Sequence, residues 1–277
     1  MFKLCIVIVT WNNQNDIVDC LKSIISQKLD FEYKIIVVDN ASKDKTIELA
    51  SQFENVDIIK NRKNIYLSPA NNQGIRYAIK NYSPEYVMVL NPDTVLGDDL
   101  IKTLIATFNN QRDLLAVGPK VVFYKNKLEG RINSAGLYFD GFAQAYDIGF
   151  EEVDNGQYDY IKNVFGVSGV CIVYNVKLLS KIGYYWEQIK MYYDEIELFI
   201  RASKAGLKVI YNGNVCIYHK WMQSVSKNKS LKLEFYKKLA LLKIAFRHYN
   251  FRSKLSMLKN FLVFLFKYTK NKILKKN

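Results

Sequence analysis

Short apolar runs alternate with amphipathic segments along the first half of the chain. The runs, rich in Val and Ile, cover residues 3–10, 33–38, 56–60 and 86–90. Uninterrupted apolar runs of this length are typical of parallel strands that are covered on both faces. The segments between them have apolar residues at helical spacing and begin near residues 15–16, 44, 69 and 98–99. Strand followed by helix, repeated with short connections, predicts an α/β fold with a doubly wound, mostly parallel sheet and flanking helices.

The pattern is less regular in the second half. Apolar stretches predict further strands at residues 121–124, 164–174, 208–211 and 215–218. Residues 191–205 are predicted to form a helix with acids in its first turns, and Gly206 is expected to end it. The Gly- and aromatic-rich stretch 130–160 has no periodicity that assigns it to a helix or a strand.

The end of the chain has the pattern of basic amphipathic helices. One apolar stripe is formed by Leu231, Phe235, Leu239, Leu242 and Phe246. A second amphipathic segment covers about residues 251–270. From Lys220 onward the chain holds 16 Lys and Arg residues and one acid, whereas residues 1–219 hold 24 basic and 25 acidic residues. The formal net charge of +14 therefore belongs to the tail, which indicates contact with an anionic membrane surface or a nucleic acid.

The composition excludes several classes of protein. Apolar residues make up 49% of the 277 residues and charged residues 24%, which indicates a folded globular protein and not a disordered or collagen-like chain. No segment approaches the about 18 consecutive apolar residues of a membrane-spanning helix. The apolar N-terminus continues into Trp11-Asn12-Asn13 without a small-residue cleavage site, so we expect a buried strand and not a signal peptide. The four cysteines have no paired spacing, which favours buried thiols in a reducing cytosol.

Polar residues follow the predicted strands where each strand ends. They are Thr10-Trp11-Asn12, Asp39-Asn40 and Asn91-Pro92-Asp93. The carboxyl ends of parallel strands share one edge of a sheet, where open α/β sheets bind their ligands. Asp39 is suited to accept a hydrogen bond from the imide N–H of a pyrimidine base, or else is a turn or capping residue. Asp93, with Asn91 nearby, is suited to hold a divalent cation beside a nucleotide diphosphate, or else belongs to a β-turn.

Two other positions have candidate chemistry. Asp194, Glu195 and Glu197 lie among apolar residues at the start of a predicted helix. Apolar surroundings raise the pKa of a carboxyl group, as a general base requires, but acids at a helix start also complement its dipole. His219 ends a predicted strand and either completes a metal site with Asp93 or is structural. The second histidine of the chain, in the amphipathic tail, is expected to be structural.

In this order and at these separations, five motifs resemble glycosyltransferase family 2, which has the GT-A fold, and most closely its rhamnosyltransferase-like branch. The motifs are Ile6-Val7-Ile8-Val9-Thr10-Trp11-Asn12, Ile36-Val37-Val38-Asp39-Asn40-Ala41-Ser42, Asn71-Asn72-Gln73-Gly74-Ile75, Leu90-Asn91-Pro92-Asp93-Thr94 and Tyr193-Asp194-Glu195-Ile196-Glu197-Leu198, followed by Arg201-Ala202. The resemblance runs from Lys3 to about Trp221. It implies a glycosyltransferase domain at residues 1–221, with a nucleotide-sugar-binding half at 1–113 and an acceptor and catalytic half at 114–221. Residues 222–277 would then form a basic amphipathic helical tail.

The family resemblance implies an inverting transfer of a sugar from a nucleoside diphosphate sugar, dTDP-rhamnose or a UDP-hexose, to a hydroxyl group. The donor-binding residues would be Thr10, Trp11, Asn12, Asp39, Asn71, Asn91 and Asp93. Asp93 stands in the place of the metal-holding carboxylate of the family's Asp-x-Asp motif, and with His219 would hold Mg²⁺ or Mn²⁺. The family's Glu-Asp dyad occurs here as Asp194-Glu195, so the general base would be Glu195.

Enzymes of this family often extend lipid-linked cell-surface glycans, so the acceptor is expected to be a glycan or a lipid-linked glycan. The Lys-rich tail would then hold a cytoplasmic, peripheral enzyme against the anionic inner face of the cell membrane. The alternative for the tail is a helical lid packed on the domain. No stacking platform or recognised motif supports a nucleic-acid partner, and none is expected.

Three positions depart from the family pattern. The acids of the dyad are exchanged, Tyr66 stands where the family usually has Gly, and Trp186 replaces an Asp and serves either acceptor specificity or packing. These departures leave one alternative open, a non-catalytic nucleotide-sugar-binding or scaffold protein of the same fold. A sugar-phosphate nucleotidylyltransferase is disfavoured, because the residues after the first strand lack the glycine and cation of a triphosphate-binding loop.

Overall fold

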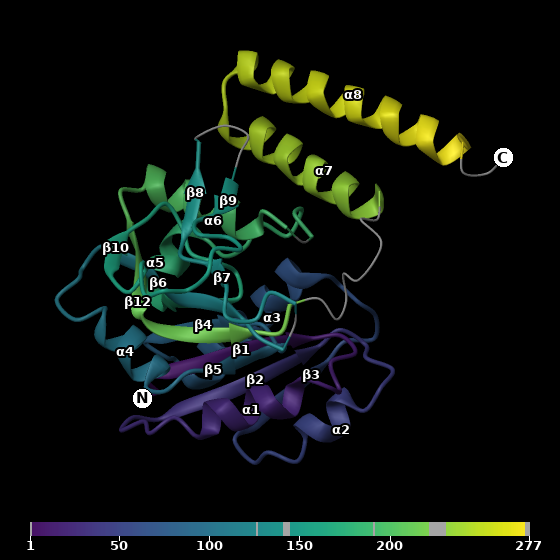
Figure 1. Ribbon diagram of the computed structural model, residues 1–277. Coiled ribbons are helices and arrows are strands. Elements are labelled where there is room, and N and C mark those ends of the chain that lie inside the picture. Colours follow the sequence, from purple (N-terminus) through teal and green to yellow (C-terminus); the bar gives the residue numbers. More distant parts are fainter. Residues whose placement is uncertain (1, 126, 141–144, 191, 222–230, 275–277) are drawn as a thin grey trace.

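A mostly parallel sheet forms the centre of the molecule (Figure 1). The computed structural model describes residues 2–125, 127–140, 145–190, 192–221 and 231–274, of which 231–233 and 266–274 are described by their backbone. The strands of the sheet follow the spatial order β10 (Ile161–Asn163), β12 (Lys208–His219), β6 (Leu114–Phe123), β11 (Cys171–Asn175), β4 (Tyr86–Leu90), β1 (Leu4–Thr10), β2 (Tyr33–Asp39) and β3 (Val56–Lys60).

The pairs β1–β2, β1–β4, β2–β3 and β6–β12, which include the longest strands, are parallel, whereas β11 is antiparallel to both β4 and β6 and β10 is antiparallel to β12. The short strands β5 (Thr94–Leu96) and β7 (Ile132–Ser134) pair with β12 and β6. The strands β8 (Leu137–Phe139) and β9 (Ala145–Asp147) form a separate two-stranded sheet. The predicted doubly wound, mostly parallel α/β fold is therefore confirmed.

Helices cover both faces of the sheet, because side chains alternate between the faces along each strand. Leu4, Ile6 and Ile8 of β1 point to the core under α1 (Ile17–Ile25), α2 (Thr46–Ala50) and α4 (Leu100–Ala106). Cys5, Val7 and Val9 point to the opposite core. That core also receives α3 (Leu67–Tyr82), α5 (Val176–Ile182) and α6 (Asp194–Lys204).

Gly74 shows why α3 lies so close to the sheet. A Cβ atom at Gly74 would lie 2.4 Å from Cγ1 of Val7 and 3.0 Å from Cγ2 of Val38. No side chain fits in that space, so the glycine lets the helix backbone pack directly on β1 and β2. This packing fixes the N-terminal half of α3 near the carboxyl ends of the strands.

Several predicted boundaries match and others differ for local reasons. The strands β3 and β4 have the predicted bounds, whereas the predicted strand 164–174 is reduced to Cys171–Asn175. Gly166 and Gly169 lie inside this stretch, in close contact with Phe199 and Glu195, so its first half packs on α6 instead of pairing along a neighbour. The two predicted strands 208–211 and 215–218 form one strand, β12, with a register shift between Asn212 and Cys216.

Asp16 precedes α1 as predicted, but its side chain does not cap the helix. It lies instead 3.2 Å from Nζ of the buried Lys220, which also contacts Asp19 at 2.8 Å. Lys220 directly follows β12, so this ion pair connects the end of β12 to the first helix. Asp16, which the sequence suggested as a helix cap, therefore neutralises the charge of the buried Lys220.

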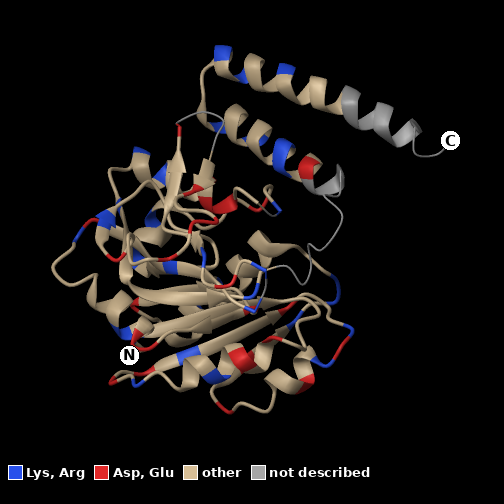
Figure 2. Cartoon of the chain, in the orientation of Figure 1, with Lys and Arg blue, Asp and Glu red and all other residues tan. Residues whose placement is uncertain are grey.

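Two long helices, α7 (Leu231–His248) and α8 (Phe251–Leu274), follow the domain (Figure 1). Both helices carry several Lys and Arg residues (Figure 2). The predicted stripe on α7 is wrong in its phase, because Phe246 is 51% exposed, while the buried positions are Ala240, Leu241, Ile244 and Ala245. Small alanines let α7 approach α6 closely, and Ala240 and Ile244 belong to the same core as the sheet. The side chain of Leu231 lies outside the described residues. Among the described residues, no helix has both the length and the apolar character to span a bilayer.

Candidate active site

The predicted site residues meet at one edge of the sheet. Thr10 and Asp39 are partners at the carboxyl ends of β1 and β2. Because β11 is antiparallel to β4, its first residue, Cys171, pairs with Leu90 at the carboxyl end of β4. Gly169 lies just before this point, and a Cβ atom built on it would be 3.7 Å from Cδ of Glu195. Glu195 and the Asn91–Asp93 turn therefore lie at the same edge, although about 100 residues separate them in the sequence.

Asp93 and His219 form a pair at this edge. Nε2 of His219 lies 3.3 Å from Oδ1 of Asp93, and Nδ1 of the same ring lies 2.8 Å from Oδ1 of Asn133 on β7. Burial opposes ionisation of Asp93, but the hydrogen bond and charge of His219 outweigh it and lower the pKa of that carboxyl. His219 is 5% exposed, so the pair is held inside the protein and not at a flexible surface.

The chemistry of this pair fits a divalent cation. When His219 is neutral and its Nδ1–H group donates to Asn133, the Nε2 lone pair is directed at the Asp93 carboxylate. Two lone pairs at this distance repel each other unless a proton or a metal ion lies between them. A carboxylate and a neutral imidazole fixed by an outer hydrogen bond are a common ligand pair. No group of three or more acids, histidines or cysteines among the described residues is arranged to hold a metal, so further ligands would have to come from a bound diphosphate.

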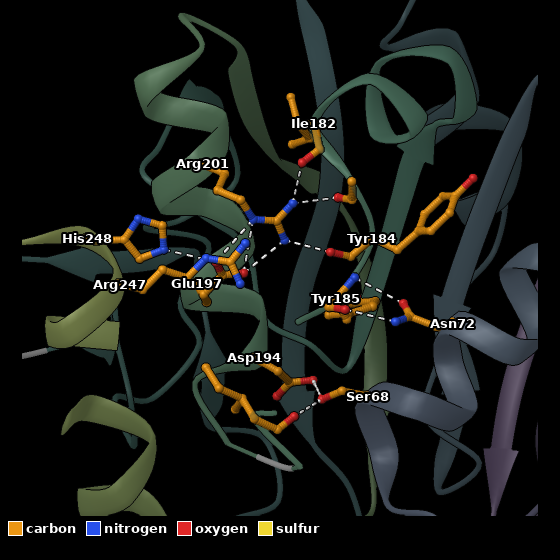
Figure 3. A network of polar contacts seen from close by, with 12 residues as sticks. Ser68, Asn72, Ile182, Tyr184, Tyr185, Asp194, Glu197, Arg201, Arg247 and His248 are labelled. Carbon is orange, nitrogen blue, oxygen red and sulfur yellow. Dashed lines mark hydrogen bonds and ion pairs between the residues drawn. The ribbon is translucent and has the colours of Figure 1, made fainter. Parts of the chain in front are cut away.

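The dyad Asp194-Glu195 begins α6 and is largely withdrawn from water. Asp194 is 4% exposed, and its Oδ2 accepts a hydrogen bond of 3.1 Å from Ser68 on α3 (Figure 3). Burial raises the pKa of both carboxyl groups. The pKa of Glu195 is raised well above its usual range, because the adjacent charge of Asp194 adds to the effect of burial. The position that the family resemblance assigns to the base therefore has the properties of a strong proton acceptor.

A cavity of about 200 Å³ opens beside Glu195. Its walls come from β9, from the residues just before α6 and from α7. Asp147 of β9 lies in this wall, and its carboxyl is close enough to both Glu195 and His219 to interact electrostatically with each. Burial raises the pKa of Asp147 to about 6, against the opposing effects of Ser134 and His219. Asp147 thus lies between the candidate base and the candidate metal pair.

Among the residues expected to bind the nucleotide, some are buried and others are exposed. Asp39 is fully buried, and its carboxylate accepts hydrogen bonds from the Thr10 hydroxyl at 2.9 Å and from the Ser42 backbone at 2.9 Å. The turn role of Asp39 is therefore present, and its contact with a base stays a prediction. Trp11 is 55% exposed. Asn12 has a positive φ of 59°, and its side chain accepts a hydrogen bond from the Lys43 backbone.

Asn71 has a more informative environment. It is 3% exposed on the first turns of α3, and its Oδ1 atom has no hydrogen-bond partner in the described structure. A buried side-chain oxygen without a partner is costly, which makes a ligand group at this point plausible on physical grounds. Asn91 has the β-turn role, because its backbone carbonyl accepts a hydrogen bond of 2.7 Å from the Thr94 hydroxyl. Its role toward a donor stays a prediction.

Glu197, the third acid of the predicted cluster, is a structural residue. It is fully buried, and its carboxylate accepts two hydrogen bonds of 3.0 and 3.1 Å from Nε and one of 2.9 Å from Nη2 of Arg201 (Figure 3). His248 and Arg247 of α7 reach the same carboxylate at 2.9 and 3.3 Å. These partners lower the pKa of Glu197 against the effect of burial. The network holds α7 to α6, so His248 is structural, as predicted.

Helix α7 also contacts the loop that precedes α6. Arg247 lies over the ring of Trp186, with its guanidinium carbon 4.4 Å from the ring centroid. Nζ of Lys243 donates to the Gln188 carbonyl at 2.6 Å. Of the two interpretations of Trp186, acceptor specificity and packing, the contact with Arg247 supports packing. Helix α7 therefore lies beside the candidate site as a lid, and α8 packs on α7.

Tyr66 keeps the backbone conformation of a glycine. Its φ of 71° and ψ of 177° lie in a region that side chains rarely occupy. Its ring lies under Nζ of Lys190, 4.4 Å from the ring centroid, and its hydroxyl pairs with that of Tyr236 on α7. The ring of Tyr66 thus contacts both Lys190 and the lid helix α7.

Sequence analysis missed Asn133 and Asp147. Both lie in the stretch 130–160, which had no periodicity, and they come from strands of three residues each. Their position depends on the pairing of β7 with β6 and of β9 with β8. The positions of both residues depend on this strand pairing, which the local sequence pattern does not predict.

Residues 5–183 match the family model of glycosyl transferase family 2, and the chain belongs to that family. It is 29% identical over 210 residues, 74% of this chain and 63% of that protein, to the low-salt glycan biosynthesis hexosyltransferase Agl10 of Haloferax volcanii. It is 31% identical over 114 residues, 39% of this chain and 34% of that protein, to the O-antigen chain rhamnosyltransferase RfbN of Salmonella typhimurium. The chain thus spans less than two thirds of the length of these relatives.

Solved structures have the same fold at low sequence identity. GalNAc-T7 with UDP, GalNAc and Mn²⁺ has a TM-score of 0.70 at 12% identity, over 88% of this chain and 48% of that chain. The mannosyltransferase PcManGT of Pyrobaculum calidifontis, in complex with GDP-Man and Mn²⁺, has a TM-score of 0.59 at 16% identity, over 92% of this chain and 68% of that chain. The predicted GT-A fold and family membership are therefore confirmed.

Proposed function

We propose that this chain transfers a sugar from a nucleoside diphosphate sugar to an acceptor hydroxyl group, with inversion at the anomeric carbon. The observation that supports this most is the arrangement at one sheet edge of the Asp93–His219 pair and the partly buried Glu195. Family relatives named as hexosyl- and rhamnosyltransferases support a dTDP-rhamnose or UDP-hexose donor. Thr10, Trp11, Asn12, Asp39, Asn71 and Asn91 would bind that donor.

The proposed reaction is a single displacement. Glu195 accepts the proton of the acceptor hydroxyl while the acceptor oxygen bonds to the anomeric carbon. The bond between that carbon and the diphosphate oxygen breaks, and its electron pair leaves with the diphosphate. Asp93 and His219 would hold Mg²⁺ or Mn²⁺, which supplies positive charge to the leaving diphosphate when it is bound. Asp194, hydrogen-bonded to Ser68, positions the start of α6 and raises the proton affinity of Glu195.

The raised pKa of Glu195 also bears on the alternative of a non-catalytic scaffold protein. Burying a carboxyl group beside a second one costs folding free energy, and a binding protein gains nothing from it. A donor screen separates the two functions. We expect dTDP-rhamnose or a UDP-hexose with Mn²⁺ to raise the melting temperature and to be consumed. Stabilisation by a nucleotide sugar without any turnover would favour the scaffold.

We also propose that the acceptor is a lipid-linked glycan and that the protein works on the cytoplasmic side of the cell membrane. Phe251, Leu255 and Leu262 are 78%, 57% and 54% exposed, and their spacing places them on one face of α8. Arg252 and Lys259 lie beside this face on the same helix. An exposed apolar stripe with flanking cations is suited to the interface of an anionic bilayer.

Liposome sedimentation tests this membrane contact. We expect binding that increases with the fraction of phosphatidylglycerol, and a variant with Leu255→Ser and Leu262→Ser that binds at least about tenfold more weakly, in keeping with the loss of two buried apolar side chains. Ile161→Ser, at an equally exposed apolar residue on β10, is the matched control and should bind as the wild type does. Binding that does not depend on anionic lipid would contradict the proposal.

A further inference from the structure

The cavity beside Glu195 has an aromatic wall. Tyr146 of β9 and Tyr192 and Tyr193, just before α6, line it. Tyr192 and Tyr193 have positive φ angles of 63° and 61°, a conformation that non-glycine residues rarely adopt and that clusters at functional sites. Tyr146 is 54% exposed and stacks on Tyr138, with ring centroids 4.8 Å apart. Exposed aromatic faces around a catalytic carboxyl provide surfaces on which the C–H groups of a sugar ring can pack.

The cavity is lined by two acidic side chains and one basic side chain. Asp147 and Glu195 are its acids, and burial raises the pKa of both. Lys237 of α7 is the one cation among the described residues that line it. Its Nζ atom lies 5.5 Å from the centroid of the Tyr192 ring. The lid helix therefore contributes a positive charge to the same cavity that the candidate base lines.

The ion pair of Lys237 leaves its charge available. Nζ lies 3.9 Å from Oε1 of Glu234, one turn earlier on the same helix, and both side chains are more than a third exposed. Exposed helical pairs of this length contribute little free energy, so a bound anion can replace Glu234 at small cost. Packing does not require a lysine here, because the buried positions of α7 are Ala240, Leu241, Ile244 and Ala245.

We propose that this cavity binds an acceptor sugar that bears an anionic group, with Lys237 contacting the anion and Asp147 accepting a hydrogen bond from a hydroxyl near the reacting one. The inference rests on the proposed function, which it extends to the acceptor. The shared chemistry is a sugar ring with a carboxylate or a phosphate. The cavity can hold such a ring with its reacting hydroxyl at Glu195 and its charged substituent at α7, away from the two acids.

The test compares three probes by saturation-transfer NMR and titration on the full chain with UDP and Mn²⁺. The probes are p-nitrophenyl β-glucoside, p-nitrophenyl β-glucuronide and p-nitrophenyl β-glucoside 6-phosphate. We expect the wild type to bind at least one charged probe about tenfold more tightly than the neutral one, a difference of about 1.4 kcal/mol. The probe that gains identifies the anion as carboxylate or phosphate.

Two variants and a control assign the roles. Lys237→Gln should abolish the preference for the charged probe and leave the affinity for the neutral probe unchanged. Lys238→Gln, on the neighbouring residue, which lies outside this cavity, should keep the preference. Asp147→Asn should weaken all three probes by a similar factor. Equal binding of charged and neutral probes by the wild type, or an unchanged preference in Lys237→Gln, would overturn the proposal.

Donor hydrolysis without any acceptor keeps the inference separate from the proposed function. If the wild type hydrolyses no donor yet selects charged probes through Lys237, the proposed function fails and the site stands. If donor turnover occurs without charge selection, the function stands and the acceptor inference fails.

Discussion

His219 and Asp93 face each other at 3.3 Å, with the far nitrogen of the imidazole held by Asn133 at 2.8 Å. This relationship joins the end of β12 to the turn after β4, two segments that the sheet brings together through β5. We predict that Asp93→Ala abolishes Mn²⁺-dependent donor binding in calorimetry. Asn133→Ala should weaken Mn²⁺ affinity by about 10- to 100-fold, because the imidazole loses its orientation.

The control for this pair is Asn71→Ala, which changes another polar residue assigned to the donor without touching the metal pair. It should weaken donor binding equally with and without Mn²⁺. Metal-dependent donor binding that survives in Asp93→Ala would show that the cation is held elsewhere.

The partly buried Glu195 should destabilise the fold at neutral pH. Its pKa is raised in the folded state, so the folded protein binds more protons than the unfolded chain above about pH 4.3, the ordinary pKa of Glu. Stability is therefore lost as the pH rises above that value. We predict that Glu195→Gln melts at a higher temperature than the wild type at pH 8 and at the same temperature near pH 4. A variant that melts lower at pH 8 would mean that the charged carboxylate is stabilised.

Glu197 should have the opposite effect, because its pKa is lowered by its cationic partners. Its contribution is present above about pH 4.3 and is lost as the pH falls through the folded-state pKa. Glu197→Gln leaves Arg201 and the α7 cations without their buried counter-charge and should cost about 3–5 kcal/mol at pH 7. Urea unfolding measures this loss. The exposed Glu187, paired with Arg76 at 2.9 Å, is the matched control, and Glu187→Gln should cost about 1 kcal/mol or less.

Tyr66 should be replaceable by glycine but not by alanine. Both changes remove the ring contacts with Lys190 and Tyr236, but only glycine relieves a backbone held at φ 71° and ψ 177°. We predict that Tyr66→Gly is more stable than Tyr66→Ala by about 1 kcal/mol, since strain of about 1–3 kcal/mol is offset in part by glycine's entropy. Chemical denaturation of the two variants checks the difference. Equal stability would show that this conformation is not strained.

The sequence was sufficient for the central strands because they are buried along their whole length. Leu4–Thr10 and Tyr86–Leu90 are such runs, and their bounds match the prediction to within one residue. The same pattern placed Thr10, Asp39 and Asp93 at one edge, because parallel strands end together. These residues needed no long-range information beyond the direction of the strands.

The environment of Asp147 and the role of Glu197 needed the tertiary structure. The strands β8 and β9 are three residues long, so their pairing is set by the elements packed around them and not by local pattern. In the sequence, Glu197 cannot be distinguished from the neighbouring acids Asp194 and Glu195. Its structural role follows from its contacts with Arg201, Arg247 and His248. The phase of α7 was missed because its buried face includes the small residues Ala240 and Ala245 beside Leu241 and Ile244, whereas Phe246 is exposed.

The most direct test of the central claim measures turnover and donor affinity of Glu195→Gln side by side. With a saturating nucleotide sugar, kcat should fall by about 10²- to 10⁴-fold, while the donor Kd stays within about twofold of the wild type. The wild-type kcat should also decrease as the pH falls below the raised pKa of Glu195, because the base must be ionised. A Gln variant that transfers sugar at the wild-type rate would contradict the assignment of Glu195 as the base.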